Sequence, residues 1–125
     1  MLIRDLRQAR SFTAGDGTTL CEWLHPLREE ERLRMDYSLA HAMLRPGEAS
    51  RSHRLRESSE VFVILAGEGI ISVNEDTAPV SAGQAVYVPP GAVQHLQNTG
   101  SEDLVFICLV SPPWRSEDEE IVLFS

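Results

Sequence analysis

The chain is 125 residues long with a formal net charge of −8; it has the length of one domain and should be repelled by nucleic acid and anionic membranes. All of its basic residues are arginine, which excludes lysine Schiff-base chemistry. No apolar run approaches the roughly 20 residues of a membrane span, and residues 1–5 lack the apolar core of a signal peptide. These features predict a globular cytoplasmic protein.

In chain order, the sequence predicts an N-terminal extension followed by short strands. Residues 1–35 form the extension, in which residues 13–19 are rich in turn formers and residues 26–34 form either a short helical turn or a loop. Gly67-Glu68-Gly69 and Asn74-Glu75-Asp76 are predicted turns, and residues 113–125 form an acidic C-terminal tail. Strands are predicted at residues 37–44, 51–56, 61–66, 70–73, 85–88, 93–97, 104–110 and 121–124.

The spacing of these strands indicates the fold class. Short strands that recur at roughly 8–12 residues, separated by glycine and proline turns, are typical of an all-β sandwich or barrel. The sequence contains no internal repeat and no linker, so residues 1–125 are predicted to form a single domain.

Two spaced sets of residues narrow the fold further. The first set is Gly47, His53, Leu55, Glu60 and Gly67, and the second is Gly83, Pro89, Gly91, Gln94 and Asn98. Their spacing closely resembles the two motifs of the cupin superfamily. The resemblance covers residues 37–112 and implies a jelly-roll β-barrel core there. It also implies one metal ion bound at positions that include His53 and Glu60, but Leu55 and Gln94 stand where the family usually has histidines.

The first motif places its residues by strand alternation. Side chains two residues apart on a strand point the same way, so His53 and Leu55 are predicted to share a face. Imidazole and carboxylate are both good ligands for transition metals, whereas Leu55 makes the pocket drier and cannot ligate. Glu60 is predicted to belong to the site; its alternative is a rim position, solvated or paired with Arg51 or Arg56.

The remaining ligand positions stay open. Gln94 offers an amide oxygen to a metal or hydrogen bonds to a bound molecule. His95, one residue on, is predicted to face outward unless a bulge turns it. His25 lies in the N-terminal extension, which can fold over one mouth of the barrel and bring Glu22 or His25 to the pocket.

Aromatic and apolar residues are predicted to shape the pocket, although ordinary core or dimer contacts are an alternative for each aromatic. The sequence does not say whether His41 points into the barrel or outward. The predicted pocket residues are Leu55, Phe62, Tyr87, Phe106 and His41.

Three functions follow from these residues. The first is a mononuclear metal site, with Mn, Fe, Ni, Cu or Zn acting as a Lewis acid on a small organic substrate in an oxygenase, decarboxylase or isomerase. The second is a metal-free module that binds a small ligand in the same pocket. The third is a structural role without a ligand. The resemblance also implies a homodimer in which residues 1–35 cover a sheet edge of the partner.

Overall fold

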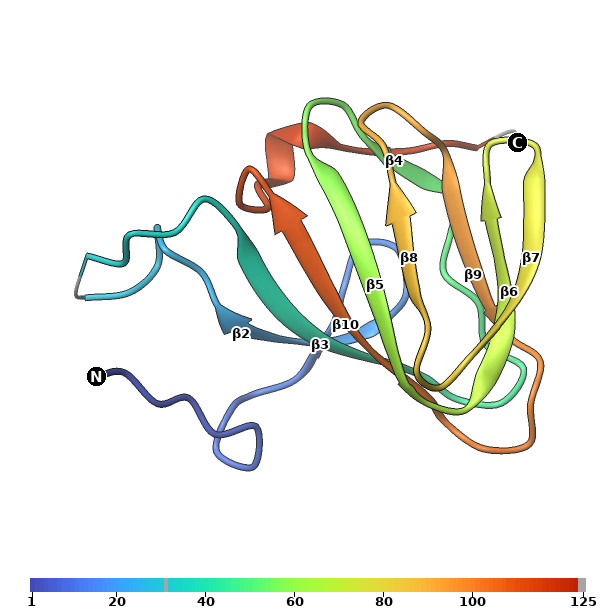
Figure 1. Cartoon of the computed structure of the whole chain (residues 1–125), viewed down its shortest axis with the longest axis horizontal. Helices are drawn as coiled ribbons and strands as arrows, with labels where there is room; N and C mark the ends of the chain where they lie inside the picture. Colours follow the sequence, from blue (N-terminus) through green and yellow to red (C-terminus); the bar gives the residue numbers. More distant parts are fainter. Residues whose placement is uncertain (31, 124–125) are drawn as a thin grey trace.

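The computed structural model describes residues 1–30 and 32–123, and it consists of two packed antiparallel sheets (Figure 1). One sheet has six strands in the order β1-β2-β3-β10-β5-β8, and the other has five in the order β11-β4-β9-β6-β7. The strands of the six-stranded sheet are β1 (Phe12–Thr13), β2 (Thr19–Leu24), β3 (Ser38–Leu44), β10 (Leu104–Ser111), β5 (Ser59–Ala66) and β8 (Ala85–Val88). Those of the five-stranded sheet are β11 (Glu119–Ile121), β4 (His53–Leu55), β9 (Gln94–Asn98), β6 (Glu68–Val73) and β7 (Asp76–Ser81).

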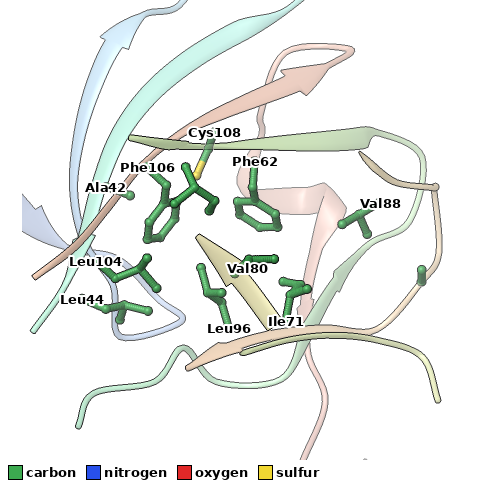
Figure 2. Close-up of a cluster of buried hydrophobic side chains, with 12 residues drawn as sticks. Ala42, Leu44, Phe62, Ile71, Val80, Val88, Leu96, Leu104, Phe106 and Cys108 are labelled. Atoms are coloured by element: carbon green, nitrogen blue, oxygen red, sulfur yellow. The ribbon is translucent and has the colours of Figure 1, made fainter. Parts of the chain in front are cut away.

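The hydrophobic core lies between the sheets because apolar residues alternate with more exposed ones along the strands. On β10 the buried residues are Leu104, Phe106, Cys108 and Val110, and the residues between them are partly exposed. Figure 2 shows side chains from both sheets converging in this cluster. Phe62 and Phe106 meet edge to face with their ring centroids 5.7 Å apart. The all-β jelly-roll prediction is therefore confirmed.

The predicted turn after residue 66 depends on glycine. Gly67 has φ +85°, and a Cβ added there would lie 2.5 Å from the backbone oxygen of Asp103. Only glycine adopts this left-handed conformation with so little room. Asn74, with φ 54°, begins the second predicted turn. The first turn leads from β5 to β6, both of which were predicted, whereas the second leads from β6 into β7, where no strand was predicted.

The N-terminal extension is more regular than predicted. Strand β2 pairs antiparallel with β3, and β1 pairs with β2, so the extension adds two strands to its own six-stranded sheet. The predicted helical turn or loop at residues 26–34 includes residue 31, which lies outside the described residues. Its described part contains turns and bends but no helix. No helix in residues 1–30 and 32–123 is long and apolar enough to cross a membrane.

Two further strands differ from the prediction. Strand β7 was not predicted; it contains Pro79 and lies at the edge of its sheet, where a missing N–H costs little. In the predicted acidic tail, a short 3-10 helix (η1, Ser116–Asp118) precedes β11, which pairs with β4. The predicted final strand at residues 121–124 therefore begins two residues earlier, and residue 124 lies outside the described residues.

Candidate functional site

Side chains that point inward from the strands line a cavity of about 110 Å³. On β5, Glu60 lines the cavity while Ile64, four residues on, lies in the core. On β9, Gln94 lines the cavity and Leu96 borders both regions. The cavity thus continues the core along the same strands. Its walls are largely apolar, with the side chains of Phe12, Leu20, Leu55, Phe62, Phe106 and Val110.

His53 is fixed with one ring nitrogen free. It is 5% exposed, and its Nδ1 lies 2.8 Å from the backbone oxygen of Arg51. Because a carbonyl only accepts, Nδ1 carries the proton and Nε2 carries the lone pair in the neutral ring. Nε2 lies 3.7 Å from Oδ2 of Asp16. His53 can therefore bind a donor or a cation at Nε2, or form an ion pair with Asp16 when it is protonated.

Glu60 and Gln94 form a buried hydrogen-bonded pair. Nε2 of Gln94 donates to Oε1 of Glu60 over 2.9 Å. Burial raises the pKa of Glu60 from 4.5 to about 7, although the charge of His53 and the Gln94 hydrogen bond oppose that rise. Glu60 therefore lies within the barrel and not at its rim. Oε1 of Gln94 is buried without a hydrogen-bond partner among the described residues.

The donor set does not make a closed metal site. Leu55 and His53 both line the cavity, as alternation predicted, so an apolar side chain occupies a position that the family usually gives to a ligand. Within the described parts of the chain, no group of three or more His, Cys, Asp or Glu side chains is arranged to hold a metal ion. The described side chains therefore form an incomplete ligand set, which a bound molecule or water would have to complete.

Two carboxylates that sequence analysis did not select complete the polar side of the cavity. Asp16 comes from the turn between β1 and β2, and Glu119 begins β11. Burial raises the pKa of Glu119, and the nearby charge of Asp16 raises it further, while His53 opposes the rise. The motif spacing gave no signal for either residue, because both lie in terminal segments that reach the pocket only through tertiary pairing.

Two of the predicted histidines lie elsewhere. His25 is buried, but its Nε2 donates to the backbone oxygen of Trp114 and its Nδ1 accepts from the N–H of Leu27, so both ring nitrogens are engaged. The extension brings Glu22, not His25, to the cavity. His41 points to the outer face of β3, where its ring meets Trp23 at 6.2 Å. Neither histidine lines the pocket, and both predictions were wrong.

Two other predicted residues are also outside the cavity. Tyr87 is 62% exposed because β8 turns it to the solvent side, with Val88 buried next to it. His95 is partly exposed and faces the opposite way from Gln94, as strand alternation predicted. It does not line the cavity, so the alternative prediction that His95 is a metal ligand is wrong. Phe62 and Phe106, by contrast, line the cavity as predicted.

The architecture is that of a jelly-roll barrel with an enclosed pocket, and comparison with known proteins names its family. The cupin-domain family model matches residues 40–110, more than half of the chain. The chain therefore belongs to the cupin family. An uncharacterised protein of Methanocaldococcus jannaschii is 29% identical over 113 residues, which is 90% of this chain and 88% of that protein.

Other similar proteins have a function in their names. The oxalate-binding protein of Thermotoga maritima is 29% identical over 112 residues, covering 88% of this chain and 93% of that protein. Among solved structures, the Streptomyces nucleoside dehydratase Pac13 superposes with a TM-score of 0.78 at 17% identity, covering 99% of this chain and 92% of that one. A predicted oxalate decarboxylase of T. maritima gives 0.73 at 22% identity, covering 89% and 99%. These structures show the shared fold.

Proposed function

We propose that this cupin binds a small organic molecule in the barrel pocket, with His53, Glu60 and Gln94 as its polar contacts and apolar side chains as its walls. An enclosed apolar pocket with a few converging polar groups is the usual form of a small-ligand site. Family members support the same class of ligand: one relative is an oxalate-binding protein, and Pac13 has been determined with uridine.

The unpaired oxygen of Gln94 carries this proposal. Buried polar atoms nearly always have a hydrogen-bond partner, and an acceptor left without one costs about 1–3 kcal/mol. The Gln94 amide is oriented by Glu60, which accepts from Nε2, and no described residue donates to Oε1. A hydroxyl or N–H group of a ligand supplies the missing donor.

Ligand-observed NMR with small alcohols, amides and amines tests the proposal. We expect saturation transfer from the wild type and from Gln97→Leu, and its loss in Gln94→Leu. Gln97 is the matched control because it lies on the same strand but is exposed. Equal signals from all three proteins would contradict a role for the pocket.

A divalent transition metal is the second candidate, favoured by the free Nε2 of His53 near the Glu60 carboxylate. Its identity among Mn, Fe, Ni, Cu and Zn remains a prediction. Elemental analysis of protein purified without chelator, beside His53→Ala and Glu60→Ala, tests it. Near-stoichiometric metal that is lost in both variants would support a metal site. The metal site would be contradicted if the wild type contained no metal and its melting temperature did not change when chelator was added.

We also propose that the protein is a cytoplasmic homodimer formed through the outer face of β3, β5 and β10. This face is apolar and only partly buried in the single chain, with side chains such as Val63, Ile107 and Leu109. Such a patch is typical of an interaction surface. Light scattering should show a dimer for the wild type and a monomer for Ile107→Glu; a monomeric wild type would contradict the proposal.

A further inference from the structure

Acidic side chains outnumber basic ones around the pocket. Four carboxyl groups line it, from Asp16, Glu22, Glu60 and Glu119, and His53 is the one basic side chain among the described lining residues. Glu22 is neutralised by an ion pair with Arg28. Each of the other three has a hydrogen-bond donor, from Thr18 to Asp16, from Gln94 to Glu60 and from the Trp114 side chain to Glu119. Their one positive partner among the described lining residues is His53, although a buried carboxylate normally needs a paired cation or several donors.

The two terminal segments bring Asp16 and Glu119 together. The N–H of Arg51 donates to the backbone oxygen of Asp16 over 2.6 Å, which anchors the β1–β2 turn next to β4. Strand β11 pairs with β4 and places Glu119 opposite Leu55. A Cβ on Gly15 would lie 3.6 Å from Oε2 of Glu119. The two acidic residues are therefore near neighbours at one wall.

Two polar atoms of the cavity lining have no hydrogen-bond donor among the described residues, and both are acceptors. Oδ1 of Asp16 already accepts from the N–H of Thr18, but Oδ2 is 3.7 Å from His53, too far for a hydrogen bond. Gln94 is 1% exposed and lines the same cavity, and its Oε1 has no donor among the described residues. A ligand that satisfies this wall must supply several donors and positive charge.

We propose that Asp16, Glu119 and Gln94 form a subsite for a protonated amine, so that the pocket takes a small alkylamine whose carbon chain lies against the apolar wall. An ammonium group has three N–H donors, no acceptor and a positive charge. Phe62 and Phe106 offer the apolar surface for its chain. The carboxylates of this subsite would repel a dicarboxylate, such as the ligand of the oxalate-binding relative. This inference rests on the proposed small-molecule function.

Three probes that share one carbon chain separate charge from shape: butylamine, 1-butanol and butyrate. Dissociation constants are measured by NMR at neutral pH with chelator present, which keeps metal ions out of the comparison. We expect butylamine to bind about tenfold more tightly than 1-butanol, because hydrogen bonds to charged groups are stronger. Butyrate should bind most weakly.

Variants that remove a charge but keep the size of the side chain test which carboxylates bind the amine. Asp16→Asn keeps the Oδ1 acceptor for Thr18, and Glu119→Gln keeps the size of its side chain. Each should weaken butylamine binding roughly tenfold and leave 1-butanol within about twofold. Glu120→Gln is the matched control, since it removes the same charge from the same strand but from a side chain that pairs with Arg54 and Arg56. It should change neither affinity.

The outcomes distinguish the two proposals. Butyrate binding as tightly as butylamine, or unchanged butylamine binding in both Asp16→Asn and Glu119→Gln, would overturn the amine subsite. In that case, 1-butanol binding that Gln94→Leu abolishes would still uphold the small-molecule function. No binding by any of the three probes would overturn both.

Discussion

The barrel interior divides into two halves that the same strands build by the same alternation. In the core half, inward positions hold apolar residues such as Leu44, Ile64 and Leu104. In the pocket half, the same rows continue with Glu60 on β5 and Gln94 on β9. The comparison teaches that polar residues at a few inward positions near one end of the strands turn a core into a site, without any change of fold.

Substitution of a core leucine should have the largest effect and tests whether the halves differ. Leu104 is 0% exposed, so Leu104→Ala should reduce the free energy of unfolding by about 2–5 kcal/mol. Leu55→Ala should cost at least about 1 kcal/mol less, because Leu55 already borders a cavity. Urea denaturation measures both, with the exposed Leu27→Ala as a control expected within about 0.5 kcal/mol of wild type. Equal costs for Leu104 and Leu55 would contradict the division.

The pocket half should also be the pH-sensitive half. The pKa of Glu60 is raised by burial from 4.5 to about 7, so the folded protein holds this proton more tightly than the unfolded chain. The resulting contribution to stability is complete below pH 4.5 and is lost as the pH rises through about 7. This contribution falls by about 3 kcal/mol between a pH well below the unfolded pKa and a pH well above the folded pKa.

Urea denaturation of chelator-treated protein at about pH 5 and pH 8 measures this slope. Wild type should lose stability relative to Glu60→Gln as the pH rises. Glu75→Gln, in an exposed turn, should keep the slope of the wild type. A Glu60→Gln variant with the wild-type slope would show that another group is responsible.

The position of β11, which brings Glu119 to the cavity, should depend on Asp118. Asp118 is 2% exposed and accepts the N–H groups of Glu57, at 2.7 Å, and Ser58, at 3.1 Å. Asp118→Ala removes the acceptor of both N–H groups, of which that of Ser58 is buried, and should cost about 2 kcal/mol. Its neighbour Glu117 is exposed, so Glu117→Ala serves as the control. Hydrogen exchange should show increased opening of β11 in Asp118→Ala alone; protection equal to wild type would refute the role.

The smallest effect is expected outside both halves. Glu120 forms ion pairs with Arg54, at 3.0 Å, and Arg56, at 2.8 Å, where all three side chains are partly exposed. Such pairs contribute little because water and salt screen them. Glu120→Gln should therefore leave the free energy of unfolding close to that of the wild type, and added salt should reduce any difference. A larger, salt-independent loss would show that this edge supports the barrel.

Motif spacing predicted the centre of the site but not its rim. His53, Leu55, Glu60 and Gln94 all line the cavity. Strand alternation predicted the shared face of His53 and Leu55, whereas the resemblance to the cupin motifs implied the positions of Glu60 and Gln94. Asp16 was missed because it lies in a turn of the N-terminal extension, and nothing in its local sequence indicates where that turn docks.

Histidines were the least predictable candidates. His25 was one of two candidates in the extension for reaching the pocket, the other being Glu22, but the carbonyl of Trp114 and the N–H of Leu27 engage its ring. His41 faces outward because the alternation of β3 places Ala40 and Ala42 inside. Alternation states which residues share a face, and the packing of the second sheet decides which face is covered.

The sequence by itself determined the all-β architecture, the turns at Gly67 and Asn74, and the shared face of His53 and Leu55. These features depend on the backbone freedom of single residues and on a side-chain period of two, both of which are local. Only the tertiary structure decided that β1, β2 and β11 complete the sheets and bring Asp16 and Glu119 to the wall beside His53. Strand pairing between distant segments depends on the packing of the whole chain, which no short stretch of sequence specifies.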